Sequence, residues 1–463
     1  MNSTLLDESD MSNPGQADAT PFTSTRQLAD YLAAGAKPRE RFTIGTEHEK
    51  FGVRFADFAA PPYEPGGIRA LLEGMAAADG WEPIRDGGNP IGLSKGTASV
   101  SLEPAGQVEL SGGLLETVHD TRDEMAAHIA LARRVAEPLG FGFVGLGFHP
   151  TLAREQMPWM PKGRYAVMRR YMPTVGSLGL DMMTRTCTVQ ANLDFADEAD
   201  MVRKMRVGLA LQPVASALFA NSPFTEGRPN GFLSYRAHVW TDTDPHRTGI
   251  PAVFFEDGFG FERYADWLID DVPMYFVYRD GRYVDLAGKS FRRFMQGAFP
   301  EAGPATMGDA VDHVTTVFTD VRLKRFIEMR GADAGSLEMM VAQTALWVGL
   351  LYDEAALAAA AALVRRHSWQ EFAALRLLVP RLALGAPWQD GTVRELAREV
   401  VAIARDGLRA RRRLDRQGRD ETVHLAPLEA LVAGAPTQAE RWLAKFYGNW
   451  NGDITAIFRS AAL

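Results

Sequence analysis

The sequence predicts an α+β fold in which helices cover one face of a mainly antiparallel sheet. Short segments alternate polar and apolar residues; some are joined directly by hairpin-like turns, and others are separated by amphipathic helical segments. Tight turns connect antiparallel neighbours, because parallel strands need a long crossover. We expect a disordered polar tail at 1–24 and a single catalytic domain at 25–463 with a helical C-terminal portion.

The first part of the chain supplies three of the expected strands or hairpins. Period-two alternation predicts strands, and the turn residues at 104–106 predict a hairpin. Amphipathic spacing predicts helices, the second of which closes on Gly80. In chain order the expected elements are a helix at 25–35, a strand at 41–55, a helix at 66–80, a hairpin at 98–112, a helix at 120–140 and a strand at 141–150.

The remaining elements are predicted by the same rules. Asp197 is a suitable cap for a long helix, and Asp280-Gly281 between two β-rich runs indicates a hairpin. The glycine-rich stretch at 87–97 is expected to be a flexible loop. The expected elements are a strand at 184–195, a helix at 197–219, a hairpin at 274–286, a strand at 322–331 and otherwise helices from about 310.

Composition and charge exclude several classes of protein. With 46% hydrophobic and 23% charged residues, the chain is an ordinary globular protein rather than a disordered one. A net charge of −8 argues against nucleic acid or an anionic membrane as the main partner. No stretch reaches the roughly 20 apolar residues of a membrane span. A single cysteine, Cys187, permits no intrachain disulfide and fits a reducing compartment, and the polar N-terminus favours a cytoplasmic location.

Carboxylates recur at strand spacing. Glu47 and Glu49 stand at i and i+2, so both side chains face the same side of the expected strand, roughly 7 Å apart. In the hairpin, Glu103 lies opposite Gln107, and Glu109 shares that face. Gln190 with Asn192, and Glu328 with Arg330, repeat the same spacing on two further segments. If these strands form one sheet, these carboxylates and amides converge on one face with the guanidinium of Arg330, and the hard oxygen atoms favour Mg²⁺ or Mn²⁺.

The simpler interpretation is that each pair is only the solvated face of a half-buried strand. For any single pair that interpretation is the better one. Repetition on several strands favours a site, because facing glutamates repel each other unless cations or basic groups compensate them.

Arginines and lysines are also grouped. The stretch at 162–186 contains Lys162, Arg164 and Tyr165, and the stretch at 234–249 contains Arg236 and Arg247. Arginine suits bidentate binding of carboxylate or phosphate, although most arginines form ordinary surface ion pairs. Carboxylates for a metal ion together with arginines for anions indicate a reaction of a metal–nucleotide complex.

Five motifs taken together resemble the plant-type glutamate–cysteine ligases of plants and many proteobacteria. They are TIGTEHEKFG, SLEPAGQVELSG, the block from PKGRYAVMRRYMP to MMTRTCTVQANLDF, ANSPFTEGRPNGFLSYRAHVWTDTDPHRTG, and FIEMRGAD. The resemblance extends from about Gln27 to the C-terminus and implies a glutamine-synthetase-like antiparallel sheet that forms a funnel for Mg²⁺, ATP and glutamate. Plant members regulate themselves through intramolecular disulfides, which one cysteine cannot form.

The resemblance also implies roles for individual residues. It implies that Glu47, Glu49 and Arg330 are catalytic and that Lys162, Thr188 and Arg330 bind the nucleotide. Arg236, Arg247, Asn192, Tyr165 and Arg164 are the implied substrate-binding residues. The implied metal ligands are Glu47, Glu49, Glu103, Glu109, Gln190 and Glu328.

The implied activity joins L-glutamate to L-cysteine at the expense of ATP, through an acyl phosphate, and needs no covalent enzyme intermediate. Two alternatives stay open at this point: a related ligase that uses another amine, and a binding protein that kept the fold without the activity. The partners are then small molecules, with no nucleic acid and no membrane, and the protein is a monomer or a homodimer.

Overall fold

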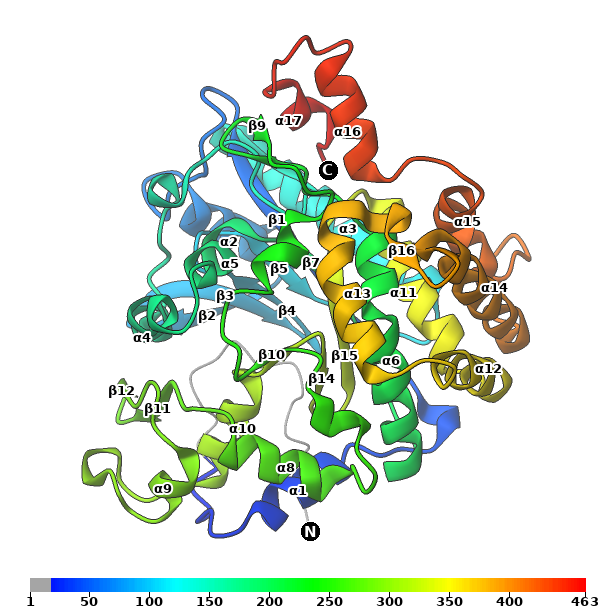
Figure 1. The fold of residues 1–463 in the computed structure, drawn as a ribbon. Coiled ribbons are helices and arrows are strands. Elements are labelled where there is room, and N and C mark those ends of the chain that lie inside the picture. The colour runs from blue at the N-terminus through cyan, green and yellow to red at the C-terminus, as the bar shows by residue number, and fades with distance from the viewer. Residues whose placement is uncertain (1–17) are drawn as a thin grey trace.

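The computed structural model describes residues 18–463, and its centre is a nine-stranded sheet in which every pair of neighbours is antiparallel (Figure 1). The strand order is β14-β15-β7-β1-β5-β4-β3-β2, and β6 pairs with β1 in addition. The strands are β1 (Ile44–Arg54), β2 (Glu82–Asp86), β3 (Asn89–Lys95), β4 (Ala98–Leu102), β5 (Val108–Ser111), β6 (Phe141–Val144), β7 (Thr188–Leu193), β14 (Val321–Leu323) and β15 (Ile327–Asp333). The α+β prediction with a large antiparallel sheet is confirmed.

Strand β1 is the centre of the sheet. Glu47 lies opposite Ser111 of β5 on one side and opposite Gln190 of β7 on the other. The pleat directs Glu47 and Glu49 to one face, whereas the intervening His48 is fully buried on the other face, where its ring meets that of His128 at 5.4 Å.

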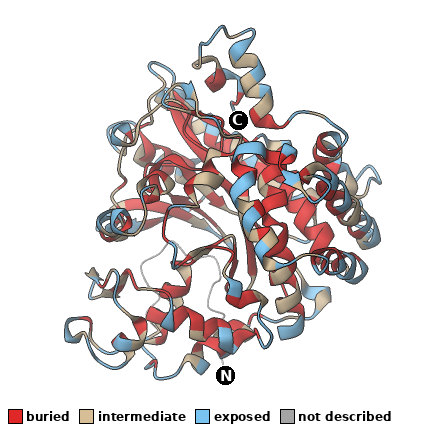
Figure 2. Cartoon of the chain, viewed as in Figure 1, coloured by how far each residue is buried: buried red, intermediate tan, exposed pale blue. Residues whose placement is uncertain are grey.

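Helices cover that second face of the sheet. Four of them pack directly on its strands: α2 (Ile68–Asp79), α3 (Val118–Ala136), α6 (Glu198–Leu218) and α11 (Leu337–Leu351). Asp197 caps α6 by accepting a hydrogen bond from the backbone N–H of Asp200, as the sequence predicts. Buried residues concentrate in the sheet and in these helices (Figure 2).

Further helices complete the molecule. α12 (Glu354–Val364), α13 (Trp369–Leu382) and α14 (Val393–Arg411) surround α6 and α11, while α15 (Ala426–Val432), α16 (Gln438–Tyr447) and α17 (Ala456–Ser460) end the chain (Figure 1). Within the described part of the chain, no single helix is long and apolar enough to cross a membrane; α11 and α12 together would be, but they are bent by 91°.

A smaller layer lies below the sheet in Figure 1. It contains α1 (Thr25–Ala33), α8 (Phe261–Asp270), α9 (Phe291–Met295), α10 (Met307–Thr315) and the hairpin of β11 (Phe276–Arg279) and β12 (Arg282–Asp285). Short elements near the site are α4 (Gly163–Tyr171), α5 (Gly179–Arg185), α7 (Tyr235–Val239), β10 (Thr248–Gly249) and β13 (Phe318–Thr319).

Three sequence-based expectations need correction. The stretch at 87–97 is not a loop, because most of it forms β3, which pairs with β2 through a hairpin. The segment at 322–331 is not one strand but the hairpin β14–β15, which turns at 324–326. Residues 18–24 already belong to the folded part, since Phe22 is 2% exposed in the core; residues 1–17 of the expected tail lie outside the described residues.

A bulge in β15 is the irregularity that matters most for the site. The register between β15 and β7 shifts between Met329 and Ala332, which places Arg330 and Gly331 in the bulge. Helix α6 secures it, because Gln212 accepts a hydrogen bond from the Gly331 N–H (2.9 Å) and Ser216 donates to the Gly331 carbonyl (2.9 Å). Bulges re-aim side chains, and this one directs Arg330 into the open face of the sheet.

Candidate active site

The open face of the sheet forms a cleft of about 760 Å³. Strands β1, β4, β5, β7 and β15 supply its floor, and the cleft brings together residues that are far apart in the sequence. Of the residues predicted to form a site, Glu47, Glu49, Glu103, Glu109, Arg164, Gln190, Asn192 and Arg330 line this cleft.

Glu47 is held by two amides from β7. Gln190 Nε2 donates to Glu47 Oε2 (2.5 Å), and Asn192 Nδ2 donates to Glu47 Oε1 (2.9 Å). The oxygen of Gln190 in turn accepts a hydrogen bond from Arg330 (2.6 Å). This chain links β1, β7 and β15 across the floor of the cleft, and it fixes the orientation of the Glu47 carboxylate.

The other carboxylates of the cleft repel one another. Burial, with Glu103 and Glu109 nearby, raises the pKa of Glu49 well above its usual range, although the Thr188 N–H donates to this carboxylate at 2.9 Å. Burial and the charges of Glu47 and Glu103 raise the pKa of Glu109 to about 8. The pKa values of both carboxyl groups are therefore raised by burial first and by neighbouring carboxylates second, and Arg236 and Lys162 oppose these effects only in part.

A divalent cation is the chemical partner that this oxygen-rich surface fits. Carboxylates and an amide oxygen are the ligands that Mg²⁺ and Mn²⁺ prefer, and a cation would favour the charged forms of Glu49 and Glu109, which burial and the neighbouring carboxylates disfavour. Across residues 18–463, no three His, Cys, Asp or Glu side chains already form a group that could hold a metal ion. The identity of the ligands and of the metal therefore stays a prediction.

Glu328 lies apart from this group and has its own cations. It is fully buried and pairs with Arg322 (2.6 Å), Arg330 (3.1 Å) and Lys324. Burial opposes ionisation of Glu328, but the three cations outweigh it and lower the pKa of this carboxyl. Glu328 does not line the cleft, so here it positions basic side chains, and its role as a metal ligand stays a prediction.

Basic residues that sequence reasoning missed line another part of the cleft. They come from the segment before β1 and from the β14–β15 hairpin, and they are Lys37, Arg41, Arg322, Lys324 and Arg325. The signal was present in RLKR at 322–325, but reading that segment as one strand concealed the turn that gathers its cations. The cleft thus combines a carboxylate cluster, formed by Glu47, Glu49, Glu103 and Glu109, with a basic cluster formed by the five residues above. Arg330 is hydrogen-bonded to both Gln190 and Glu328.

A chamber of about 120 Å³ adjoins the cleft and shares Glu49, Glu103, Arg164 and Arg330 with it. Its wall is otherwise aromatic and thioether-rich, with residues Tyr165, Met168, Met182, Met183, Trp240, Phe276 and Phe318. Thr188 and Arg236, both predicted from the sequence, line it as well, together with Gln107 and several threonines.

Arg236 is the buried cation of this chamber. Arg236 is only 3% exposed. One of its terminal nitrogens donates to the Arg330 carbonyl (3.0 Å), whereas its Nε has no hydrogen-bond partner among the described residues. Burial lowers the pKa of this guanidinium. An arginine with an unused donor in a chamber is suited to bind an anionic group of a ligand.

Two predicted residues line neither the cleft nor the chamber. Arg247 is fully buried elsewhere and pairs with Asp244 (2.7 Å), bonds to Thr316 (3.0 and 3.1 Å) and lies over the Tyr275 ring at 3.9 Å. Lys162 is buried too, donates to the Leu102 carbonyl (3.2 Å), and has a pKa that burial lowers to about 7. Neither lines the cleft or the chamber, although Lys162 is close enough to Glu103 and Glu109 for their charges to interact, so the substrate and nucleotide roles expected of Arg247 and Lys162 stay predictions. The motifs that contain them contribute to the site through other residues.

Residues 43–460 match the sequence model of glutamate-cysteine ligase family 2. This range includes all the cleft residues named above except Lys37 and Arg41. The chain belongs to this family. A chloroplastic glutamate–cysteine ligase of Nicotiana tabacum is 49% identical over 95% of this chain and 83% of the relative. Glutamate–cysteine ligase B of Oryza sativa subsp. japonica, also chloroplastic, is 48% identical over 95% and 87%.

Among solved structures, a glutamate–cysteine ligase of Francisella tularensis in complex with AMP shares the fold. It superposes with a TM-score of 0.55 at 12% identity, and the match covers 91% of this chain and 87% of that chain. The expectation of a cytoplasmic location is contradicted by the plant relatives, which are named chloroplastic. That expectation depended on the composition of the first residues, and composition there says little about compartment.

The raised pKa of Glu109 predicts a pH dependence. As the pH rises, the unfolded chain loses this proton near the ordinary value of 4.5, whereas the folded protein keeps it until about 8. The metal-free folded protein should therefore lose stability between those values, and Glu109→Gln should flatten this dependence. Urea unfolding of both proteins at pH 5 and pH 8 measures it.

The exposed glutamate Glu116 provides the matched control, since Glu116→Gln should leave the pH dependence unchanged. Saturating Mg²⁺ should stabilise the wild type more at pH 8 than at pH 5, because a ligand that binds only the folded state raises its stability. Parallel pH profiles of the wild type and Glu109→Gln would contradict the carboxylate cluster.

The buried position of Arg247 predicts a structural effect. Arg247→Ala leaves Asp244 buried without its partner, so the free energy of unfolding should fall by about 3–5 kcal/mol. Denaturant titration measures this, and an exposed pair such as Arg366 with Glu399 gives the control, because Arg366→Ala should cost less than about 1 kcal/mol. A stable Arg247→Ala protein would refute the structural role.

Proposed function

We propose that this protein catalyses the ATP-dependent joining of the L-glutamate γ-carboxylate to the amine of L-cysteine, which gives γ-glutamylcysteine, the first step of glutathione biosynthesis. The observation that carries the proposal is the meeting of a carboxylate cluster, a basic cluster and an arginine-lined chamber around Arg330. The names of the 48–49% identical relatives supply the substrates.

The basic cluster is the proposed site of the nucleotide. A triphosphate carries several negative charges, and the cations of the basic cluster, among them Lys37, Arg41 and Arg325, can bind them. Arg330 then faces the γ-phosphate, because it is the one arginine of the proposed phosphate site that also reaches into the chamber. Thr188, expected to bind the nucleotide, lies in the chamber, where its hydroxyl donates to the Ala332 carbonyl (2.8 Å). The backbone N–H of Thr188 donates to Glu49 (2.9 Å), so the role proposed for Thr188 is to orient Glu49 rather than to bind the nucleotide.

The chamber is the proposed site of glutamate. Arg164 and Arg236 provide two guanidinium groups for its carboxylates, and Arg236 has an unused Nε. Tyr165 donates its hydroxyl to the Leu102 carbonyl (2.7 Å), so it shapes the wall and leaves recognition of charge to the arginines. The methionines and aromatic rings of the same wall offer an apolar contact for a thiol side chain.

The reaction balances without a covalent enzyme intermediate. An oxygen of the glutamate γ-carboxylate attacks the γ-phosphorus of ATP, the bond to the β,γ-bridging oxygen breaks, and ADP leaves. The cysteine nitrogen then attacks the acyl carbon, phosphate leaves, and the amine loses a proton to solvent or to phosphate. Arg330 and the basic cluster stabilise the negative charge on the transferred phosphoryl group.

Glu47, Glu49, Glu103, Glu109 and the oxygen of Gln190 are the proposed ligands of Mg²⁺ or Mn²⁺, with Glu328 at the far end of the same network. When bound, such a cation would neutralise part of the triphosphate charge and orient it. Asn192 and Gln190 hold the Glu47 carboxylate toward the cleft for this purpose.

The deciding experiment measures ADP release by the purified protein with Mg²⁺, ATP and glutamate, with cysteine or other amines, and identifies the product by mass. Cysteine-dependent ADP together with the mass of γ-glutamylcysteine is the expected result. Turnover with another amine alone would keep the chemistry and change the acceptor. No turnover with any amine would refute the proposed function.

The variants Glu47→Gln and Glu328→Gln distinguish a glutamate that lines the cleft from one that is buried among cations. Glu47→Gln should lower turnover by about 100-fold or more while the protein stays folded, because glutamine keeps the size of the side chain and its one carbonyl oxygen still accepts a hydrogen bond from Gln190 or Asn192. Glu328→Gln should also lower turnover, but it leaves three buried cations without a full counter-charge. Glu328→Gln should therefore also lower the stability of the protein.

Initial rates, with thermal melting as the measure of folding, check both variants, and Glu116→Gln again serves as the control. Full activity of both variants would remove the carboxylates from the mechanism. Equal melting temperatures for the two would contradict the distinct setting of Glu328.

A further inference from the structure

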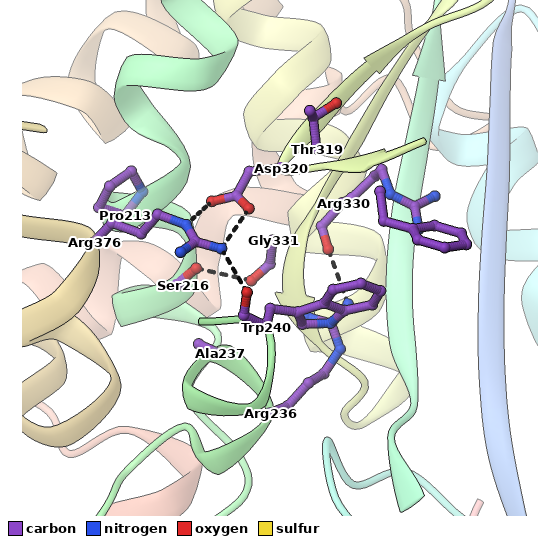
Figure 3. A pocket seen from close by; sticks show the side chains of 11 residues that line it. Pro213, Ser216, Arg236, Ala237, Trp240, Thr319, Asp320, Arg330, Gly331 and Arg376 are labelled. Carbon is purple, nitrogen blue, oxygen red and sulfur yellow. Dashed lines mark hydrogen bonds and ion pairs between the residues drawn. The ribbon is translucent and has the colours of Figure 1, made fainter. Parts of the chain in front are cut away.

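A small cavity of about 30 Å³ lies behind the chamber and shares Arg236, Trp240 and Arg330 with it (Figure 3). Its far wall is formed by Arg376, which projects from α13 in the helical C-terminal portion. Arg376 lines neither the cleft nor the chamber. Its contacts nevertheless reach two segments that do.

The guanidinium of Arg376 binds Asp320 in a bidentate manner. Nε donates to one carboxylate oxygen (2.7 Å) and a terminal nitrogen donates to the other (3.0 Å), as Figure 3 shows. Both side chains are only 14% exposed. A planar, charge-assisted pair of this kind restricts the position of both partners more than an exposed lysine pair would.

Asp320 in turn holds the strand that carries Arg330. Its carbonyl accepts a hydrogen bond from the Arg330 N–H (3.1 Å), and its own N–H donates to the Gly249 carbonyl (2.8 Å). Arg330 lies in the bulge of β15, where the regular pairing with β7 is interrupted. Asp320 therefore supplies a backbone contact at the point where the ladder of the sheet does not.

The same guanidinium fixes a wall of the chamber. A terminal nitrogen of Arg376 donates to the Trp240 carbonyl (3.2 Å), at the end of α7. The Trp240 ring lies 5.8 Å from the Phe318 ring and 5.9 Å from the Arg236 guanidinium. One side chain of α13 thus joins the segment of Arg330 to the segment of Trp240.

We propose that Arg376 is a positioning residue for the ligation reaction: it sets the orientation of Arg330 and of the Trp240 wall without touching a substrate. This inference rests on the proposed function. A misplacement of reacting groups by about 1 Å can cost on the order of 100-fold in rate, so a residue outside the site can control turnover.

The test compares three variants of the full chain by steady-state kinetics and thermal melting. Arg376→Gln should lower kcat by about 10- to 100-fold while the KM for ATP changes by less than about twofold, because the phosphate-binding cations stay in place. Arg376→Lys keeps a charge beside Asp320 but loses the planar fork, so it should recover only part of kcat. Arg381→Gln removes an exposed arginine from the same helix and should match the wild type.

Hydrogen exchange of the peptide at 327–333, measured by mass spectrometry, gives a readout that does not depend on activity. Exchange of this peptide should be faster in Arg376→Gln than in Arg381→Gln.

If the wild type makes γ-glutamylcysteine and Arg376→Gln keeps its kcat, the positioning role is wrong and the proposed function stands. If the wild type makes no product, the proposed function fails, and equal exchange in the two variants would overturn the positioning role as well. Should Arg376→Gln not fold, a wild-type kcat in Arg376→Lys overturns the proposal and a reduced kcat with normal melting supports it.

Discussion

Negative charge on the open face of β1 and the β4–β5 hairpin is the constraint around which the site is organised. Burial and, after it, the neighbouring carboxylates raise the pKa values of Glu49 and Glu109. Arg236 and Lys162 offset these effects only in part. Glu328, by contrast, is fully compensated by Arg322, Lys324 and Arg330. Glu328, which its cations neutralise, belongs to a structural ion network. Glu49 and Glu109, which are not fully neutralised, belong to a surface that is suited to bind a cation.

Arg330 connects these two electrostatic environments. Through Gln190 it is linked to Glu47, and directly it is bonded to Glu328. Its backbone is held from three directions: by the Asp320 carbonyl, by Arg236 and, through Gly331, by helix α6. A side chain that must meet a transferred phosphoryl group benefits from such support, because a rigid donor needs no reorganisation as charge develops.

The predictable part of the site is the part that follows the strand period. Glu47 with Glu49, and Gln190 with Asn192, alternate with buried residues, and the antiparallel register brings them together as the sequence indicates. Arg247 shows the limit of this reasoning, because no periodicity distinguishes an arginine that binds a ligand from one that pairs with Asp244 in the core. Lys324 was missed because a turn of three residues, not the alternation, decides where it points. The β3 strand was missed because its glycine and proline resemble a loop, although β2 and β4 enclose it on both sides.

The strand order has a consequence for the synthesis of the chain. β7 at Thr188–Leu193 pairs with β15 at Ile327–Asp333, so a nascent chain carries β7 as an open edge until more than a hundred further residues have been made. An unpaired apolar edge is a template for wrong pairing, and non-local pairing of this kind is slow. During that interval the acidic face is already present without Arg330 or Glu328. Pairing of β15 with β7 therefore covers this edge and brings Arg330 to the acidic face in the same event.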